Sequence, residues 1–241
     1  MTPTTSLSQE LLDELWDFTD PEASERRLKD AAREPGRTPE TRAELETQVA
    51  RALGLQGRFE EADRLLGRVV FDSPPVATRL LLERGRILNS SRHPDAAAPY
   101  FISARLTAKR AHLAFLEVDA LHMLAISDAD NAARWTDEAL AVLDQTGEER
   151  TRRWAVSLHN NLGWHLHDLH RYDEALTQFS LAQGAAIRFG TEEQRFRSRW
   201  AIARCLRSLG RLPEALALQR ELAAERPGDA DVAEELSELG E

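Results

Sequence analysis

The feature that most constrains the fold of this chain is a local phrase that occurs three times along it. Residues 57–62 read Gly-Arg-Phe-Glu-Glu-Ala, residues 170–175 read His-Arg-Tyr-Asp-Glu-Ala, and residues 210–215 read Gly-Arg-Leu-Pro-Glu-Ala. Each copy joins a tight turn to a large apolar residue and then to acidic residues, which the helix dipole favours in a first helical turn. The phrase therefore predicts turns that end one helix and begin another, with an alanine where two helices approach closely.

The alanine that closes the phrase marks a longer repeat. With two weaker copies included, Ala62, Ala97, Ala132, Ala175 and Ala215 lie 35, 35, 43 and 40 residues apart. The residue twelve positions earlier is always small: Ala50, Gly85, Ala120, Gly163 or Ala203. The residue nine positions earlier is always large and apolar: Leu53, Leu88, Met123, Leu166 or Leu206. Small and large residues at fixed offsets, facing a small residue on the next helix, indicate helical hairpins with interlocking faces.

These residues resemble tetratricopeptide (TPR) repeats, units of two helices and 34 residues. The clearest copy has Leu162-Gly163 and Leu166 in its first helix, then Tyr172, Ala175, Phe179 and Ala182 in its second. Pro74 and Pro227 stand where the family ends its second helix. The resemblance covers roughly residues 40 to 230. It departs from the family at the tryptophan position, which holds Glu46, Leu81, Leu116, His159 and Arg199.

The resemblance implies an all-α fold, a right-handed α-solenoid of stacked antiparallel helical hairpins that forms a TPR-like superhelix. We expect an N-terminal hairpin at residues 1–36, as a cap or degenerate repeat, with Asp20-Pro21 starting its second helix. The solenoid is expected at residues 40–229, with about five hairpins at approximately 43–76, 78–111, 113–146, 156–189 and 196–229. The acidic residues at 230–241 predict a solvated capping helix or tail.

The two longer repeat steps predict longer helices. We expect an extension of about two turns near residues 140–160 and of one or two turns near residues 183–200, because each turn takes 3.6 residues.

Composition limits the kinds of partner. A formal net charge of −10 gives no general attraction for nucleic acid or anionic membranes. No stretch approaches the roughly 18 apolar residues of a membrane span, and the N-terminus lacks the pattern of a secretory signal, so we expect a cytoplasmic location. Cys205 is the single cysteine, which excludes an intrachain disulfide and a cysteine-based zinc site.

In the TPR family the first helices of the repeats form a concave wall that commonly binds extended peptides or another protein's helix. Transferring the family's groove positions by register selects arginines, asparagines, a histidine and two tryptophans. The candidate binding residues are Arg51, Arg86, Asn89, Asn160, Asn161, Trp164, His167, Arg197, Trp200, Arg204 and Arg207. We expect the tryptophans, Arg197 and Arg204 to be the anchors, because tryptophan and arginine most often anchor interfaces.

An alternative interpretation of the same residues is structural. Both tryptophans could pack between helices while the arginines pair with Asp168 and with Glu192 or Glu193.

Some TPR domains hold a C-terminal carboxylate with a clamp of two basic residues and two asparagines. Asn161 and Arg197 fall at matching positions, but Glu117 and Leu121 stand where the preceding repeat needs Lys and Asn. Only half of the clamp is present, so a chaperone tail is not the expected ligand.

We expect neither a metal nor a cofactor, and no enzymatic activity. His165 and His167 are two residues apart and point about 200° apart on a helix, so they cannot share a metal ion. The chain has no Gly-rich phosphate loop, no HExxH motif and no Ser-His-Asp set in a strand–turn–helix context.

The leading hypothesis is a non-catalytic adaptor that binds another protein or an extended peptide, including one with an acidic or carboxylate end. A second hypothesis is a bacterial regulatory TPR sensor module that binds a signalling peptide or acts on a regulator in trans. A third is a structural solenoid that self-assembles through its ends, which leaves a homo-oligomer open.

Overall fold

The structure is a computed structural model that describes residues 7–70 and 72–241. Residues 1–6 of the expected N-terminal hairpin lie outside the described part. The chain divides into two compact units, residues 1–130 and 131–241, which we call the N-terminal unit and the C-terminal unit.

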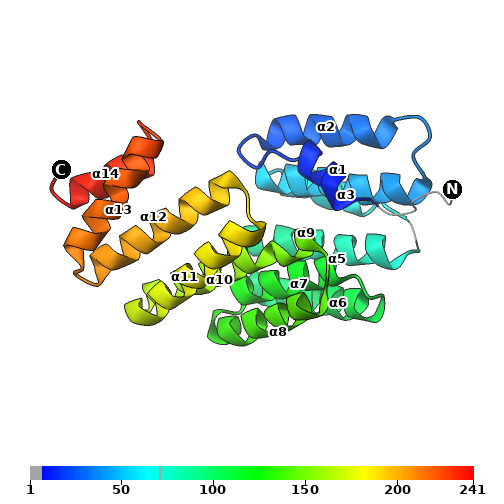
Figure 1. Cartoon of the computed structure of the whole chain (residues 1–241). Helices are drawn as coiled ribbons and strands as arrows, with labels where there is room; N and C mark the ends of the chain where they lie inside the picture. The colour runs from blue at the N-terminus through cyan, green and yellow to red at the C-terminus, as the bar shows by residue number, and fades with distance from the viewer. Residues whose placement is uncertain (1–6, 71) are drawn as a thin grey trace. The chain divides into compact units, whose positions relative to one another are not determined.

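The N-terminal unit consists of helices joined by short turns, and Figure 1 shows them from blue to green. They are α1 (Gln9–Leu15), α2 (Pro21–Arg33), α3 (Pro39–Leu55), α4 (Phe59–Leu66), α5 (Pro74–Ser90), α6 (Pro94–Arg110) and α7 (Ala114–Ser127). Helices that follow one another pack together, most extensively α5 with α6, α6 with α7, and α2 with α3. A short 3-10 helix, η1 (Ala129–Asn131), follows α7.

The C-terminal unit is built in the same way and ends in a short helix. Its helices are α8 (Ala132–Gln145), α9 (Glu149–Arg152), α10 (Trp154–Asp168), α11 (Tyr172–Phe189), α12 (Glu192–Ser208), α13 (Leu212–Glu225) and α14 (Ala230–Glu238). Throughout residues 7–70 and 72–241 the regular structure is helical and contains no strand. The predicted all-α class of antiparallel helical hairpins is confirmed.

The helices begin where the sequence offers capping side chains. The Asp20 carboxylate accepts a hydrogen bond from the Ala23 amide at 2.9 Å, and Pro21 takes the first helical position of α2, as predicted. Thr191 and Gln194 form a reciprocal capping box at the start of α12. Each cap satisfies amide groups that have no acceptor within their own helix, so the chain fixes these boundaries locally.

The repeated phrase forms the same turn three times. Its first residue has a positive φ in every copy: 73° at Gly57, 58° at His170 and 74° at Gly210. In each copy the arginine that follows donates two hydrogen bonds to the carboxylate of the glutamate three residues later. Their lengths are 2.6–2.9 Å. These contacts explain why Arg and Glu recur in the phrase, since the pair closes the first turn of the new helix.

The expected close approach of the helices is visible at two glycines, although each faces a phenylalanine ring and not the small residue that was predicted. A Cβ atom added to Gly85 would lie 2.4 Å from the ring of Phe101, and one added to Gly163 would lie 2.6 Å from the ring of Phe179. Both rings are fully buried. Where the first helix has Ala50 instead of glycine, the equivalent position of the second helix has the smaller Leu66, in the same cluster. A larger side chain on the second helix thus accompanies a smaller one on the first, and this allows the two helices of a hairpin to pack closely.

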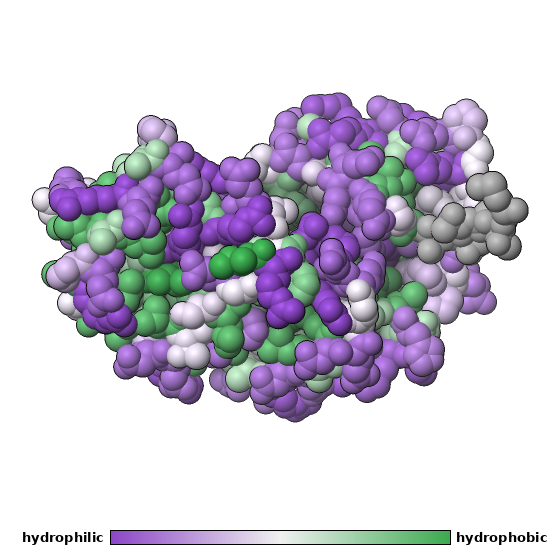
Figure 2. Space-filling model, viewed as in Figure 1, coloured by the Kyte–Doolittle hydropathy of each residue, from purple (hydrophilic) through white to green (hydrophobic). Residues whose placement is uncertain are grey.

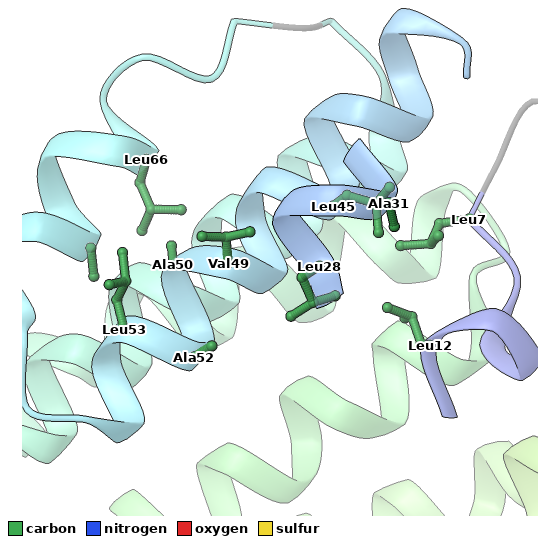
Figure 3. Packing of buried hydrophobic residues seen from close by; sticks show 11 residues of the cluster. Leu7, Leu12, Leu28, Ala31, Leu45, Val49, Ala50, Ala52, Leu53 and Leu66 are labelled. Atoms are coloured by element: carbon green, nitrogen blue, oxygen red, sulfur yellow. The ribbon is translucent and has the colours of Figure 1, made fainter. Parts of the chain in front are cut away.

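The core of the N-terminal unit extends into its first helices. Leu7 and Leu12 lie near Leu28 of α2 and Leu45 of α3 in one buried cluster (Figure 3). In Figure 2 hydrophilic residues cover α2, whose Leu28 and Ala31 are buried. The N-terminal segment is therefore packed into the unit as an extra layer.

One expectation about the longer repeat steps was wrong. The structure does not extend a helix through residues 140–160; α8 ends at Gln145, and the separate four-residue helix α9 precedes α10. Gly147 and the turn around it stop α8, because glycine is a poor continuation of a helix. A cavity of about 520 Å³ lies between α8, α9, α10 and α11, lined by Leu143, Arg152 and His159 among others. At the second longer step, where one or two extra turns were expected, α11 has 18 residues and α12 has 17, close to the 17 residues of α5 and α6.

Candidate functional site

Eight of the eleven candidate residues lie on two helices of the C-terminal unit. We call this surface the α10–α12 face, formed by Asn160, Asn161, Trp164 and His167 of α10 with Arg197, Trp200, Arg204 and Arg207 of α12. All eight side chains are partly exposed.

Two tryptophans and one arginine form the centre of this face. The ring centroids of Trp164 and Trp200 lie 5.9 Å apart with an interplanar angle of 47°. The Arg204 guanidinium carbon lies 6.0 Å from the Trp164 ring centroid and 5.5 Å from that of Trp200. Cation–π attraction at such distances contributes about 0.5–1 kcal/mol at exposed sites and more where water is excluded. The structure therefore brings both tryptophans together around a cation.

Each tryptophan also takes part in the core. Trp164 meets the Phe179 ring edge to face at 4.7 Å, and Trp200 packs against the cluster of Phe196, Leu222 and Val232. The Nε1 atom of Trp200 is buried and has no hydrogen-bond partner. One side of each ring thus supports the fold, as the alternative interpretation expected, while the other side belongs to the α10–α12 face.

The α10 side of the face carries amide and imidazole groups. Asn160 Nδ2 donates to Asn161 Oδ1 at 3.4 Å, and His167 Nε2 lies 2.8 Å from the Ser208 hydroxyl of α12. Burial lowers the pKa of His167, and the nearby Arg204 adds to this effect. The imidazole is therefore mostly neutral at pH 7 and can either donate or accept a hydrogen bond.

The three arginines of α12 meet carboxylates from the end of the chain. Arg204 and Arg207 both bind Glu235 of α14, at 2.9 Å and 2.8 Å. Arg197 pairs with Asp229 at 3.1 Å and with Asp231 at 2.7 Å. Arg197 also binds Glu193 of its own helix at 2.8 Å. Of the intramolecular partners that the sequence suggested for these arginines, Glu193 is present, whereas the main partners come from residues 229–238.

The acidic end of the chain differs from the expected solvated cap. Glu235 is only 1% exposed, although it is a charged residue in a short terminal helix. Glu235, Asp229 and Asp231 were not among the binding residues predicted from the sequence. The sequence contained a signal for the burial of Glu235. Val232, Glu235 and Leu236 have the spacing of one helix face, so the acid lies beside two apolar residues.

The other three candidate residues lie in the N-terminal unit. The Arg51 guanidinium lies 5.5 Å from the ring centroid of Trp16 and 5.3 Å from that of Phe18. Arg86 joins Glu83 and Asp119 in a buried ion-pair network. Asn89 is partly buried on α5, one turn further along. The N-terminal segment thus already contacts one of the predicted binding arginines.

The first helices α3, α5 and α7 also enclose a cavity of about 210 Å³. Its lining includes Arg51, Leu55, Glu83, Arg86 and Met123. Burial raises the pKa of Glu83, whereas Arg86 beside Asp119 holds the pKa of that carboxyl below its usual range despite its burial. The polar side of the cavity is therefore a buried network of charges, in which Glu83 Oε2 has no hydrogen-bond partner among the described residues.

The remaining reactive residues are in structural positions. The Cys205 thiol is buried, donates to the Tyr172 carbonyl oxygen at 3.3 Å, and has a pKa raised by burial to about 11. Within the described residues, no group of three or more His, Cys, Asp and Glu is placed to hold a metal ion. Among these residues no helix combines the length and the apolar character needed to cross a membrane.

Comparison with known structures finds the same fold at low sequence identity. BtubC (BKLC) from P. vanneervenii is 18% identical with a TM-score of 0.63, over 90% of this chain and 92% of that chain. A putative kinesin light chain with nearly identical TPR-like repeats from Podosopora anserina is 16% identical with a TM-score of 0.59, over 79% of this chain and 99% of that chain.

A larger protein contains a similar region. The Signal Transduction ATPase with Numerous Domains (STAND) protein with a tetratricopeptide repeat sensor from Pyrococcus horikoshii is 14% identical with a TM-score of 0.67. The match covers 91% of this chain but 36% of that chain. No curated protein matches the chain.

The family model described as Tetratricopeptide repeat matches residues 49–111 and 161–230, more than half of the chain. Such repeats are a scaffold for protein interactions, and proteins with this fold are generally not catalysts. With these repeats and this fold, the protein belongs to the tetratricopeptide repeat family.

Proposed function

We propose that the protein is a non-catalytic adaptor that binds another protein or an extended peptide on the α10–α12 face. The observation that carries this proposal is the grouping of Trp164, Trp200 and Arg204, with ring centroids 5.9 Å apart and the guanidinium near both rings. Partly exposed aromatic rings beside a cation are the kind of surface from which interface hot spots are made. A cytoplasmic location remains part of this proposal.

The chemistry of the face suggests how a peptide is held. Asn160 and Asn161 offer amide groups to the backbone of an extended chain, which has both donors and acceptors to satisfy. The exposed side of Trp164 takes an apolar side chain, and Arg204 favours a carboxylate nearby. An acidic or C-terminal carboxylate is thus the preferred polar feature of the ligand.

A selection experiment tests this function directly. A phage-displayed library of random peptides is panned on the full chain, and the affinity of each selected peptide is measured by fluorescence anisotropy. We expect Trp164→Ala and Arg204→Gln to weaken binding at least tenfold, a loss typical of an interface hot spot. Leu181→Ala, at an exposed position on α11, is the control and leaves the affinity unchanged.

Folding is followed in parallel because Trp164 also packs against Phe179. Arg204→Gln removes the charge of a partly exposed side chain but keeps its aliphatic stem, and Glu235 still pairs with Arg207. Its melting temperature should therefore stay close to that of the wild type. If selected peptides bind both variants as tightly as the wild type, the proposed face is wrong.

A second candidate function is a regulatory sensor that binds a signalling peptide and acts on a regulator in trans. The similarity to a protein with a tetratricopeptide repeat sensor favours this candidate. It differs from a simple adaptor in one measurable respect, because a sensor changes conformation when its ligand binds. Hydrogen exchange far from the bound peptide distinguishes the two, since an adaptor shows protection at the binding face alone. Light scattering over a range of concentrations tests self-assembly.

A further inference from the structure

We infer that the α12 side of the α10–α12 face is a site for an acidic amphipathic helix, and that α14 is an internal occupant which a partner helix displaces. This inference rests on the proposed function and names the class of partner. Its evidence is the way in which residues 229–238 cover the predicted binding residues of α12.

Every arginine of the face on α12 is matched by a carboxylate of this segment. Glu235 lies between Arg204 and Arg207, accepting hydrogen bonds from both at 2.8–3.0 Å. Arg207 also reaches Glu238 at 3.5 Å. At the other end of α12, Arg197 binds Asp229 and Asp231. The segment therefore supplies the acidic ligand that an arginine-lined face favours.

The apolar side of α14 covers the aromatic part of the same surface. Val232 is 1% exposed and packs in one cluster with Phe196 and Leu222. Leu236 and Trp200 are partly buried against that cluster. Val232, Glu235 and Leu236 occupy positions i, i+3 and i+4, so one face of α14 presents two apolar residues and an acid. This pattern defines the ligand that α12 recognises.

Several features make this contact exchangeable. α14 has nine residues, whereas isolated helices shorter than about 12–15 residues are marginal in water, so it is held mainly by its contacts. It follows Gly228, which has a φ of 86°. Arg204 is 35% exposed and Asp231 is 54% exposed at the side chain, so water reaches the pairs from one side. Hydrated pairs of this kind contribute little individually.

The partner is therefore a helix with acids at i, i+4 and i+7 and apolar residues at i+1 and i+5, as in Asp231, Glu235 and Glu238 with Val232 and Leu236. A tethered helix competes at a high effective concentration, so α14 reduces the affinity for any such partner. Release of α14 strengthens binding in trans.

The test uses the full chain and a labelled peptide that copies residues 229–241. Glu235→Lys places a cation between Arg204 and Arg207 and should release α14. Glu234→Lys is the matched control, because Glu234 is exposed on the same helix and the change in charge is identical. Fluorescence anisotropy measures peptide binding, and hydrogen exchange reports whether α14 is open.

We expect the peptide to bind Glu235→Lys at least about tenfold more tightly than Glu234→Lys or the wild type, because the tethered competitor is gone. Adding Arg204→Gln and Arg207→Gln to the released variant should remove this binding. A peptide of the same composition in scrambled order, which lacks the pattern, should not bind.

Three results overturn the inference. The first is faster exchange in α14 of Glu235→Lys without tighter peptide binding, and the second is exchange no faster than in Glu234→Lys. The third is a wild-type dimer that dissociates in Glu235→Lys, which would identify a second copy as the occupant. Library peptides that bind the wild type through Trp164 distinguish failure of this inference from failure of the proposed function.

Discussion

The two units join their successive first helices by different chemistry. In the N-terminal unit, α3 is linked to α5 by Glu44 and Arg79, whose side chains are 1% and 5% exposed. In the same unit Arg86 links α5 to Asp119 of α7. In the C-terminal unit, α10 meets α12 through Trp164 and Trp200, and α12 meets α14 through arginines that remain partly exposed.

The contrast separates pairs that fix a fold from pairs that can be exchanged. Removing one member of a fully buried ion pair leaves the other charge uncompensated and shielded from water. Separating such a pair therefore costs much of the free energy of folding. A pair with one hydrated member loses much less when it separates, because water replaces the partner. The same residue types therefore make a rigid framework in the N-terminal unit and a displaceable contact in the C-terminal unit.

The largest effect is expected from Arg79→Ala. Glu44 then keeps its 2.8 Å hydrogen bond from the Leu7 amide but loses the guanidinium that pairs with it. We expect the free energy of unfolding to fall by about 3–5 kcal/mol, the usual cost of breaking a buried pair. Arg204→Ala should cost about 1 kcal/mol or less, because Glu235 keeps Arg207. Urea denaturation followed by circular dichroism compares them, and equal losses would break the contrast between the units.

Acidification provides a second test in the N-terminal unit. Burial lowers the pKa of His122 to about 4, with Asp119 opposing this shift and Arg86 and Arg51 adding to it. Between pH 6.5 and pH 4 the unfolded chain gains a proton at His122 that the folded chain does not bind. Stability therefore falls with decreasing pH in this window, by up to about 3 kcal/mol in total at 1.36 kcal/mol for each unit of pKa.

His122→Gln isolates this contribution from the other titrating groups. The difference in unfolding free energy between the wild type and His122→Gln should decrease from pH 7 to pH 4.5. A constant difference over this range would show that His122 is protonated as easily in the folded chain as in the unfolded chain. The same comparison with His167→Gln extends the test to the C-terminal unit, where the shift has the same direction.

A smaller effect tests a feature that both units share. Gly163→Ala places a methyl group 2.6 Å from the Phe179 ring, and we expect a loss of about 1–3 kcal/mol from overpacking. Gly85→Ala should cost a similar amount, because its methyl group would lie 2.4 Å from Phe101. Adding Phe179→Leu to Gly163→Ala copies the pair of Ala50 and Leu66, and should recover part of the loss. Additive losses in this double-mutant cycle would argue against direct coupling of the two positions.

The smallest effect concerns the repeated turn. His170 holds a φ of 58° where the other two copies have glycine. His170→Gly removes the steric cost of this conformation and should raise the free energy of unfolding by about 0.5–1 kcal/mol. The loss of the exposed hydrogen bond between His170 and Tyr172 offsets part of this gain. Gly210→Ala should lower stability by a similar amount. Thermal unfolding of the two variants checks that their shifts have opposite signs.

Much of the fold was predictable because its determinants are local or regular. The turns at residues 57–59, 170–172 and 210–212 depend on residue types at adjacent positions, and the Gly163–Phe179 contact follows from a fixed spacing. The separate helix α9 was missed because spacing measures how many residues are inserted and not whether they continue a helix. Gly147 was the available signal for a break.

The candidate site was predictable in position but not in its internal partners. Register places Trp164, Trp200 and Arg204 on one face, and the structure brings their side chains together. The pairing of Arg207 with Glu235 depends on how α14 packs against α12, which buries the Glu235 carboxylate. Periodicity within one helix does not predict which acid a neighbouring helix will place beside it.

The state of Cys205 makes the displacement of α14 accessible to optical measurement. Its thiol is buried and, with a pKa of about 11, stays protonated near neutral pH, so it reacts slowly with maleimide dyes. Because the chain has no other cysteine, a dye pair can be attached through Ser237→Cys, at an exposed position of α14, and Ser157→Cys without replacing the natural residue. Single-molecule energy transfer between the dyes can then record each opening and closing of the terminal helix in an otherwise unaltered protein.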